Sequence, residues 1–216
     1  MLGLIGGTGP EGRGLALRFA LAGEKVFIGS RSRERGQQIA QELGQLAPSA
    51  FHSISGGTNE EAASRAELVL ITTPYEGQKE TLEALRPKLT GKIVVNVIAP
   101  LSFERGRVTA IHVPEGSAAL QAKALLPDSI IVSAFQNMSA EDLLVPDKRV
   151  DCDVIVCADD AEARQAVMAL AEKIQGVRAV NGGGLANAHY VEELTALLVS
   201  INRTYKVHSS IRITGL

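Results

Sequence analysis

A glycine-rich turn near the N-terminus joins an apolar run to an amphipathic stretch, and it constrains the fold more than any other feature. The run "LGLIGG" predicts a buried strand, and "GRGLALRFALAG" predicts a helix that ends at Gly23. Between them, Gly7, Gly9 and Gly12 form the pattern G-x-G-x-x-G. A strand, this pattern and a helix in that order are typical of a dinucleotide-binding βαβ unit, and therefore of an open α/β fold.

The alternation of apolar and amphipathic segments continues as far as Phe135. Near-continuous apolar runs are typical of parallel strands that are covered on both faces. Strands are expected within 25–30, 66–74, 91–100 and 129–135, and helices within 33–46, 77–89 and 117–126. The sequence therefore predicts a Rossmann-like parallel sheet.

The regular alternation of strands and helices changes after Phe135. A short helix and loop come first, followed by an apolar strand at 152–158, a helix at 161–174, a short strand at 177–183 and a long helix at 185–206. We therefore expect an NADP-binding domain over 1–135 and a smaller C-terminal α/β domain over 136–216. No linker rich in Pro, Gly or Ser separates the two, so they are expected to pack tightly.

The three glycines of the turn have different expected tasks. Gly7 permits the tight turn, Gly9 lets the backbone approach a pyrophosphate, and Gly12 lets the helix pack close to the strand. The helix N-terminus then offers unpaired N–H groups and the positive end of its dipole to the phosphates.

The segment "GSRSRER" (29–35) ends the second strand, where a carboxylate would bind the adenosine ribose 2′-hydroxyl of NAD. This chain has Ser30 and Arg31 there instead. Arg31 can pair with a phosphate, and Arg35 lies one helical turn further on, so both can face one anion. Arg33 falls on another face. The segment predicts a preference for NADP(H).

Two more loops follow strand ends, the place where open α/β sheets bind ligands. Thr73 and Pro74 of "TTPYE" are expected to border the nicotinamide ribose. Val97 and Ala99 of "NVIAP" are expected to line the nicotinamide face.

Composition argues against several other classes of protein. A net charge of −2 and 4% aromatic residues without Trp argue against nucleic-acid binding. No apolar run approaches the ~18 residues of a membrane span, and no signal peptide is evident, so a cytoplasmic protein is expected. Cys152 and Cys157 lie on opposite faces of a strand and are expected to be buried thiols. The four histidines lack zinc-like spacing, so no metal site is expected, and no catalytic residue stands out.

Several segments together resemble the NADPH-dependent reductases of coenzyme F-420, the deazaflavin hydride carrier. They are "IGGTGPEGRGLALRFALAGEKVFIGSR", "ITTPYE", "IVVNVIAP", "IIVSAFQNMSA", "CDVIVCADD" and "SINRTYKVHSSIRITGL", and they are spread over nearly the whole chain. The first is the most specific, because it couples the glycine loop with the Ser-Arg pair.

The resemblance implies a homo-oligomeric enzyme that transfers a hydride between NADP(H) and the deazaflavin. It implies NADP contacts at Thr8, Gly9, Pro10, Glu11, Ser30, Arg31 and Arg35. It also implies a deazaflavin pocket near Gln136 and Asn137, between the two portions. Similar proteins have a histidine in this loop, whereas Gln136 can hydrogen-bond a ring carbonyl but cannot change its charge near neutral pH.

Two other functions stay open at this point. The first is an NADPH-dependent reductase of another acceptor, either a flavin or a small imine or carbonyl compound, and Gln136 in place of histidine supports it. No clear proton donor for a small carbonyl is found, since the three tyrosines lack a Tyr-x-x-x-Lys partner. The second is an NADP sensor without enzymatic activity. Hydride transfer between two ring carriers needs mainly correct stacking, which agrees with the lack of catalytic side chains.

Overall fold

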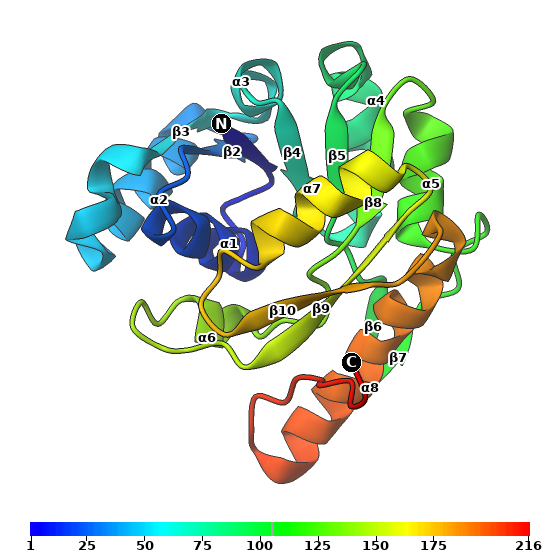
Figure 1. Ribbon diagram of the computed structural model, residues 1–216. Coiled ribbons are helices and arrows are strands. Elements are labelled where there is room, and N and C mark those ends of the chain that lie inside the picture. The colour runs from blue at the N-terminus through cyan, green and yellow to red at the C-terminus, as the bar shows by residue number, and fades with distance from the viewer. Residues whose placement is uncertain (105) are drawn as a thin grey trace.

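The protein is built on one eight-stranded sheet covered by helices on both faces (Figure 1). The computed structural model describes residues 1–104 and 106–216. The strand order is β10-β9-β8-β5-β4-β1-β2-β3, and every pair is parallel except β8 with β9. The order β3-β2-β1-β4-β5-β8 is that of a dinucleotide-binding fold, so the predicted α/β class is confirmed.

The elements have the following bounds. The strands are β1 (Leu2–Ile5), β2 (Val26–Ser30), β3 (Ile54–Thr58), β4 (Leu68–Ile71), β5 (Ile93–Asn96), β6 (Leu101–Glu104), β7 (Arg107–Ala110), β8 (Ile130–Ser133), β9 (Cys152–Ala158) and β10 (Val177–Asn181). The helices are α1 (Pro10–Leu21), α2 (Arg33–Leu46), α3 (Asn59–Arg65), α4 (Gln78–Leu89), α5 (Ala118–Leu125), α6 (Ala140–Leu143), α7 (Ala161–Ala171) and α8 (Ala188–Tyr205). Three short 3₁₀ turns are η1 (Pro48–Ser53), η2 (Tyr75–Gly77) and η3 (Leu185–Asn187).

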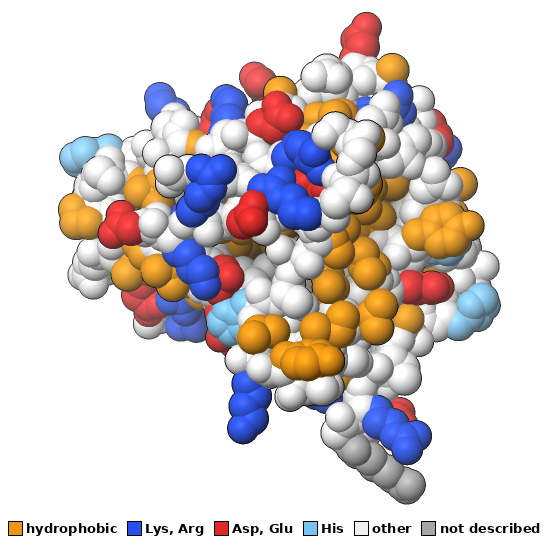
Figure 2. All heavy atoms as spheres, turned by 60° about the horizontal axis from the view of Figure 1, so that its bottom comes forward, with side chains coloured by type: hydrophobic (Ala, Val, Ile, Leu, Met, Phe, Trp, Pro, Cys, Tyr) orange, Lys and Arg blue, Asp and Glu red, His pale blue; other side chains and the backbone are white. Residues whose placement is uncertain are grey.

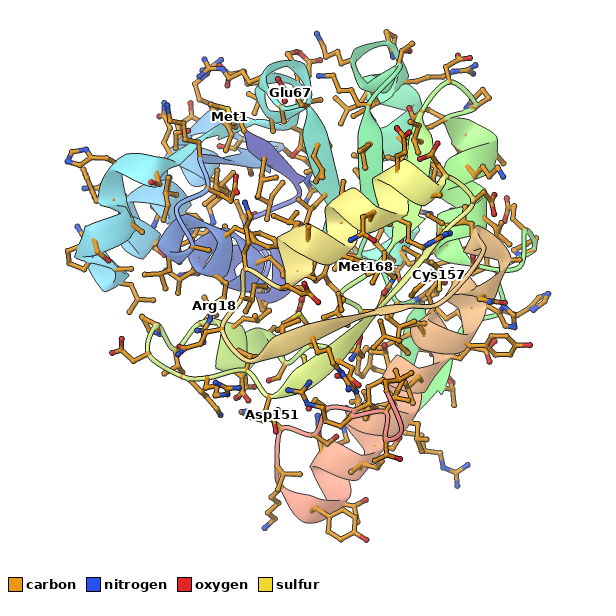
Figure 3. The ribbon with its side chains drawn as sticks, in the orientation of Figure 1. Met1, Arg18, Glu67, Asp151, Cys157 and Met168 are labelled. Carbon is orange, nitrogen blue, oxygen red and sulfur yellow. The ribbon has the colours of Figure 1, made fainter. Side chains whose placement is uncertain are left out.

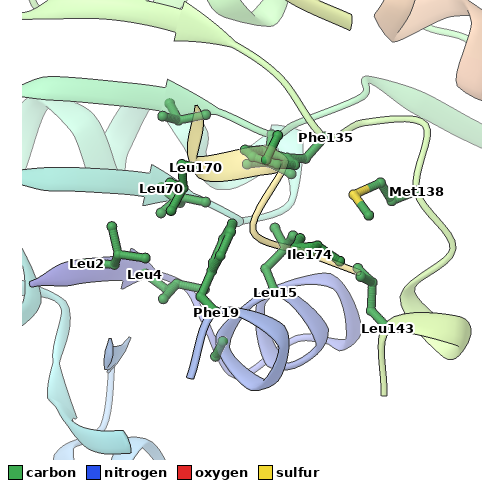
Figure 4. Close-up of a cluster of buried hydrophobic side chains, with 14 of the residues drawn as sticks. Leu2, Leu4, Leu15, Phe19, Leu70, Phe135, Met138, Leu143, Leu170 and Ile174 are labelled. Atoms are coloured by element: carbon green, nitrogen blue, oxygen red, sulfur yellow. The ribbon is translucent and has the colours of Figure 1, made fainter. Parts of the chain in front are cut away.

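Two hydrophobic cores lie on opposite faces of the sheet. One joins α1, α2 and α7 to the strands, and the other joins α3, α4 and α5 to them. Figure 4 shows part of the first core, where the rings of Phe19 and Phe135 meet edge to face with centroids 5.8 Å apart. Both side chains are fully buried, and burial of a large apolar side chain contributes about 1.5–3 kcal/mol. The sheet is therefore held rigid from both sides.

The residues after Phe135 extend the same sheet. β9 pairs antiparallel with β8, and β10 pairs parallel with β9. The expected boundary at residue 136 falls in the connection between β8 and β9, and the division of the chain into two domains stays a prediction. Cys152 and Cys157 are free and buried, as expected. None of the helices in the part of the chain that the structure describes is long and apolar enough to span a membrane.

Sequence analysis missed the segment from β3 to α3 and the β6–β7 hairpin. β3 has the sequence ISGGT, which carries too few apolar side chains to show a strand pattern. Its glycines are needed because the backbone of α2 is in direct contact with the backbone of β3. A Cβ on Gly56 would lie 2.1 Å from the carbonyl oxygen of Gly36. The close packing explains why a strand with Ile54 as its one apolar side chain is stable at the edge of the sheet.

Candidate functional site

All the residues singled out from the sequence lie at one edge of the sheet. They follow the carboxyl ends of β1, β2, β4, β5 and β8, which are consecutive in the sheet order β8-β5-β4-β1-β2. The chain leaves β1 toward β2 on one side and later continues through β4 on the other. The glycine turn after β1 therefore lies at the topological switch point, where open α/β sheets bind ligands.

The glycine turn leaves three backbone donors unused. Gly6 donates its N–H to Asn59 Oδ1 (2.9 Å), and Gly7 donates to the carbonyl of Gly29 (2.9 Å). The N–H groups of Thr8, Glu11 and Gly12 have no acceptor within residues 1–104 and 106–216. These donors surround the N-terminus of α1, which begins with Pro10 and has no side-chain cap. Such a group of N–H donors binds anions.

The positions of the turn are occupied by glycine for different physical reasons. The positive φ (+69°) falls on Gly6, so Gly6 and not Gly7 makes the tight turn. Gly7 is limited by packing, because a Cβ there would lie 2.8 Å from Leu4 Cβ, and a Cβ on Gly12 would lie 2.6 Å from Gly7 Cα. At Gly9 the nearest atom would be 3.9 Å away, so nothing in the fold excludes a side chain there. Glycine is also a favoured N-cap residue, and here it leaves this side of the turn open to a ligand.

Glu11 is an acidic side chain in the first turn of α1. Its Oε1 is buried without a partner among the described residues, and burial raises the pKa of its carboxyl to about 8. At neutral pH the side chain is therefore mostly protonated. A neutral carboxyl does not repel an anion at this helix N-terminus, whereas a carboxylate would.

The end of β2 and the start of α2 present Ser30, Arg31 and Arg35 together. Ser30 is only 7% exposed, and its Oγ accepts from Ser32 N. Arg35 is exposed and held by Gln38. Arg31 is exposed and has no recorded partner in the described part of the chain. This guanidinium is therefore available to an anion.

Arg33 is engaged elsewhere. Its guanidinium donates to Glu61 Oε1 of α3 (2.7 Å). The expectation that it faces away from Arg31 and Arg35 agrees with this contact. The start of α2 is capped by Ser32, whose Oγ accepts from Arg35 N.

The loop after β4 contacts the glycine turn, and the loop after β5 lies one strand further along the sheet. Thr73 packs against the turn closely, since a Cβ on Gly6 would lie 2.6 Å from Thr73 Cγ2, and Thr73 Oγ1 is buried without a partner among the described residues. Pro74 is exposed and Ala99 half-buried, whereas Val97 is buried and donates its N–H to Ile71 O. Three of these four residues are thus at least partly exposed, and Val97 is buried.

Phe135 turns the chain sharply out of β8. It has a φ of +78°, which is unusual for a bulky side chain and indicates strain that the surrounding core must hold. Gln136 follows and is 6% exposed; its Nε2 donates to Asn96 O (3.0 Å) and Ser133 Oγ (2.7 Å). Its Oε1 is buried without a partner in the described residues. The turn therefore folds Gln136 back beneath the ends of β5 and β8, with one acceptor left over.

A network of buried amides continues from Gln136 and was not predicted. Asn96 donates to Gln78 Oε1 (2.6 Å), and Gln78 donates to Ala118 O and to Gln121 Oε1. Asn96 and Gln78 are both fully buried. Paired amides at strand and helix ends satisfy each other in the absence of water, so this network holds the ends of β5 and α4 in one arrangement.

Asn137 lies beside Gln136 but faces another way. It is 2% exposed, and its Nδ2 donates to Asp153 O of β9 (2.8 Å). Its amide nitrogen is thus engaged by β9 and is not available to a ligand, while its Oδ1 is buried without a partner in the described residues. Its task in the fold is to fasten the loop to β9.

Three more side chains that position the site were missed. Arg18 of α1 is buried and donates to the carbonyls of Asp142, Leu143, Val145 and Pro146, which ties α1 to α6, and Figure 3 labels it there. Glu192 of α8 accepts from the N–H groups of Ala118 and Ala119, and burial raises its pKa to about 7. Thr195 of α8 donates to Gln136 O (3.1 Å). Each contact joins segments far apart in sequence, so local patterns did not reveal it.

Comparisons with known proteins agree with this geometry. Residues 1–100 match the family model described as NADP oxidoreductase, coenzyme F420-dependent. The F420-dependent NADP reductase of Methanothermobacter thermautotrophicus is 40% identical over all of this chain and 95% of its own length. That of Methanocaldococcus jannaschii is 38% identical over all of this chain and 98% of its own.

A solved structure has nearly the same fold. It is that of a protein of Arthrobacter sp. FB24 assigned provisionally as an F420-dependent NADP reductase, with a TM-score of 0.84 and 25% identity, covering 99% of this chain and 98% of that one. With relatives this similar over its whole length, the chain belongs to the family of F420-dependent NADP reductases.

Proposed function

We propose that the protein transfers a hydride between NADP(H) and the deazaflavin coenzyme F-420. The identity of the hydride acceptor is supported by relatives about 40% identical over the whole chain that are named F420-dependent NADP reductases. The single structural observation that carries the proposal is the pairing of an open amide cluster after β1 with an unpaired Arg31 after β2. The first fits a pyrophosphate and the second fits a 2′-phosphate.

The residues available for NADP(H) form two groups. Thr8, Gly9, Glu11 and Gly12 offer backbone to the pyrophosphate, with Gly7 and Pro10 shaping the turn. Ser30, Arg31 and Arg35 would hold the 2′-phosphate, and no carboxylate at the end of β2 opposes it. The site fits NADP(H) because its free donors match the two phosphate groups, and because the side of the turn at Gly9 is open.

The residues that would face the nicotinamide and the acceptor lie further along the same edge. Thr73 and Pro74 would border the nicotinamide ribose, and Val97 and Ala99 its ring. The side-chain oxygens of Gln136 (Oε1) and Asn137 (Oδ1) are the amide acceptors left over after the network has formed. NADPH supplies the hydride when bound. The chain orients the two carriers and excludes water, and we assign no residue to proton transfer.

A stopped-flow experiment tests the proposal directly. Purified protein is mixed with NADPH and oxidised coenzyme F-420, and in parallel with NADPH and FMN. Rapid bleaching of the deazaflavin band with NADPH, and much slower bleaching with NADH, is expected. Tight NADPH binding without deazaflavin reduction would contradict the proposed acceptor. Equal rates with NADH would contradict the role of Arg31.

We also propose that the chain forms a homo-oligomer. Figure 2 shows hydrophobic side chains gathered around α8 and the C-terminal tail. Exposed members of this surface are Tyr190, Leu197, Tyr205, Val207, Ile213 and Leu216. Exposed apolar surfaces of this kind are typical of protein interfaces. Light scattering of the wild-type chain and of Leu197→Asp tests the proposal, since a monomer in both cases would contradict it. The cytoplasmic location stays a prediction.

A further inference from the structure

The corner between β3 and α3 lies beside the glycine turn. It begins with Thr58, whose side chain caps α3 by accepting from Glu61 N (3.2 Å), while Glu61 Oε2 accepts from Thr58 N (2.9 Å). This reciprocal cap fixes the first turn of the helix. Asn59, the first residue of α3, is thereby held in one position, and its side chain is half-buried.

Asn59 reaches across to a segment 53 residues earlier in the chain. Its Oδ1 accepts the N–H of Gly6 at 2.9 Å. Gly6 is the residue with φ of +69° that turns the chain out of β1. Its neighbour Gly7 is held by the backbone carbonyl of Gly29. Two successive N–H groups of the turn therefore have acceptors within the protein, and the donors that follow at Thr8, Glu11 and Gly12 are left for a ligand.

Gly29 makes room for this contact. A Cβ at that position would lie 2.8 Å from Asn59 Oδ1 and 2.8 Å from Leu4 O. Any side chain on residue 29 would thus displace the carboxamide of Asn59 from Gly6. The sequence "GSR" at the end of β2 is accordingly matched to the Asn at the start of α3, although the two are 30 positions apart.

We propose that Asn59 is a positioning residue for the pyrophosphate of NADP(H). It touches neither phosphate nor ring, and it acts through Gly6 by holding the turn in the arrangement that presents the next three N–H groups. The inference rests on the proposed function in taking NADP(H) as the ligand. Asn59 is expected to affect the binding of the pyrophosphate and to leave the binding of the 2′-phosphate unchanged.

Three ligands separate the two ends of the site. NADPH carries both the pyrophosphate and the 2′-phosphate, ADP-ribose carries the pyrophosphate alone, and adenosine 2′-monophosphate carries the 2′-phosphate alone. We expect Asn59→Ala to weaken NADPH and ADP-ribose about tenfold, because an unpaired backbone donor loosens the turn. Adenosine 2′-monophosphate should bind within twofold of the wild-type affinity, because Arg31 and Arg35 are untouched.

Glu60→Ala is the matched control, since Glu60 is an exposed neighbour in the same helical turn and its side chain makes no recorded contact with the described residues. It should leave all three affinities unchanged. Asn59→Gln keeps the amide and the helix but displaces the oxygen, and it replaces the alanine variant if that one is unstable. The same pattern is expected of it.

Two results would overturn the inference. Unchanged affinity for NADPH in both variants at Asn59 would show that the turn holds its shape without this contact. An equal loss for all three ligands would show that the substitution disturbs β2 and β3 as a whole. A wild-type chain that bound no NADPH would instead contradict the proposed function, so the two failures are distinguishable.

Discussion

The two ends of the candidate site are built in opposite ways. At the end near α1 and α2, three backbone N–H groups and Arg31 have no partner in the described residues. At the end near Gln136, polar side chains are buried and bonded to one another through Asn96, Gln78 and Ser133. The first end is complementary to an anion, and its binding energy comes from donors that the fold leaves open. The second is held by an internal network, so its selectivity depends on shape and on two unpaired amide oxygens, Gln136 Oε1 and Asn137 Oδ1.

The largest effect that tests this difference is expected from a substitution that adds a side chain at Gly9. Gly9→Val should reduce NADPH affinity more than about 100-fold, because the new side chain occupies the approach of the pyrophosphate. Stability should change little, since the nearest atom to a Cβ there is 3.9 Å away. Gly12→Ala provides the contrast: its Cβ would lie 2.6 Å from Gly7 Cα, so it should lower the melting temperature. Calorimetry of binding and of unfolding measures both effects, and retained NADPH binding in Gly9→Val would place the nucleotide elsewhere.

Arg31→Asp tests the 2′-phosphate end. Loss of a charge-assisted contact and the repulsion from a new carboxylate should together weaken NADPH about 100-fold, while NADH should change only a few-fold. Lys25→Asp is the control, because Lys25 is exposed at the opposite end of β2 and its side chain has no partner among the described residues. It makes a charge change of the same size away from the site. Equal losses for NADPH and NADH in Arg31→Asp would refute the assignment.

Gln136→Ala tests the acceptor end, where a smaller and different effect is expected. NADPH affinity should stay within twofold, since no phosphate contact is touched. Turnover with coenzyme F-420 should fall about tenfold, because Asn96 O and Ser133 Oγ lose their donor and the network loosens. Steady-state kinetics together with a binding titration separate the two quantities. A loss of NADPH affinity as large as the loss of turnover would show that the two ends are not independent.

The same contrast explains what could be predicted from the sequence. The glycine turn and the arginines are local: they lie within 30 residues of one another, and their spacing alone predicts the two phosphate contacts, which stay a prediction. Gly6 rather than Gly7 makes the turn, which spacing alone could not decide because consecutive glycines offer the same freedom. The acceptor end depends on contacts such as that of Thr195 with Gln136, 59 residues apart, for which the sequence carries no periodic signal.

The β3–α3 corner, which sequence analysis missed, combines one feature that the local sequence could reveal with others that depend on the packing of distant segments. Its strand was overlooked because glycines replace apolar side chains where α2 approaches the backbone. The helix that follows did carry a local signal: Thr58 and Glu61 stand in the spacing of a capping box, which predicts a helix start. The contact of Asn59 with Gly6 could not be inferred from either, since it requires the order in which β1, β2 and β3 are arranged.

The prediction for Glu11 concerns the pH dependence of the nucleotide end. The pKa of Glu11 is raised from 4.5 to about 8 by burial, so the folded chain binds this proton more tightly than the unfolded chain. The stability difference between wild type and Glu11→Gln is therefore expected to be constant below about pH 4.5 and to move against the wild type as pH rises toward about 8. The slope between these values is at most about 1.4 kcal/mol per pH unit. Urea unfolding of both proteins at several pH values measures it.

Ionisation of Glu11 should also affect the affinity for NADPH. Above pH 8 the ionised Glu11 lies in the first turn of α1, among the donors offered to the pyrophosphate, and its charge opposes the phosphate there. NADPH affinity of the wild type should thus decline a few-fold between pH 7 and 9, while that of Glu11→Gln should stay level. Adenosine 2′-monophosphate, which lacks the pyrophosphate, should show no such decline with either protein. An equal decline in the affinities for NADPH and adenosine 2′-monophosphate would mean that alkaline pH acts on the fold as a whole and not on the turn. The two phosphate sites would then not be distinguishable by pH, and the prediction would be wrong.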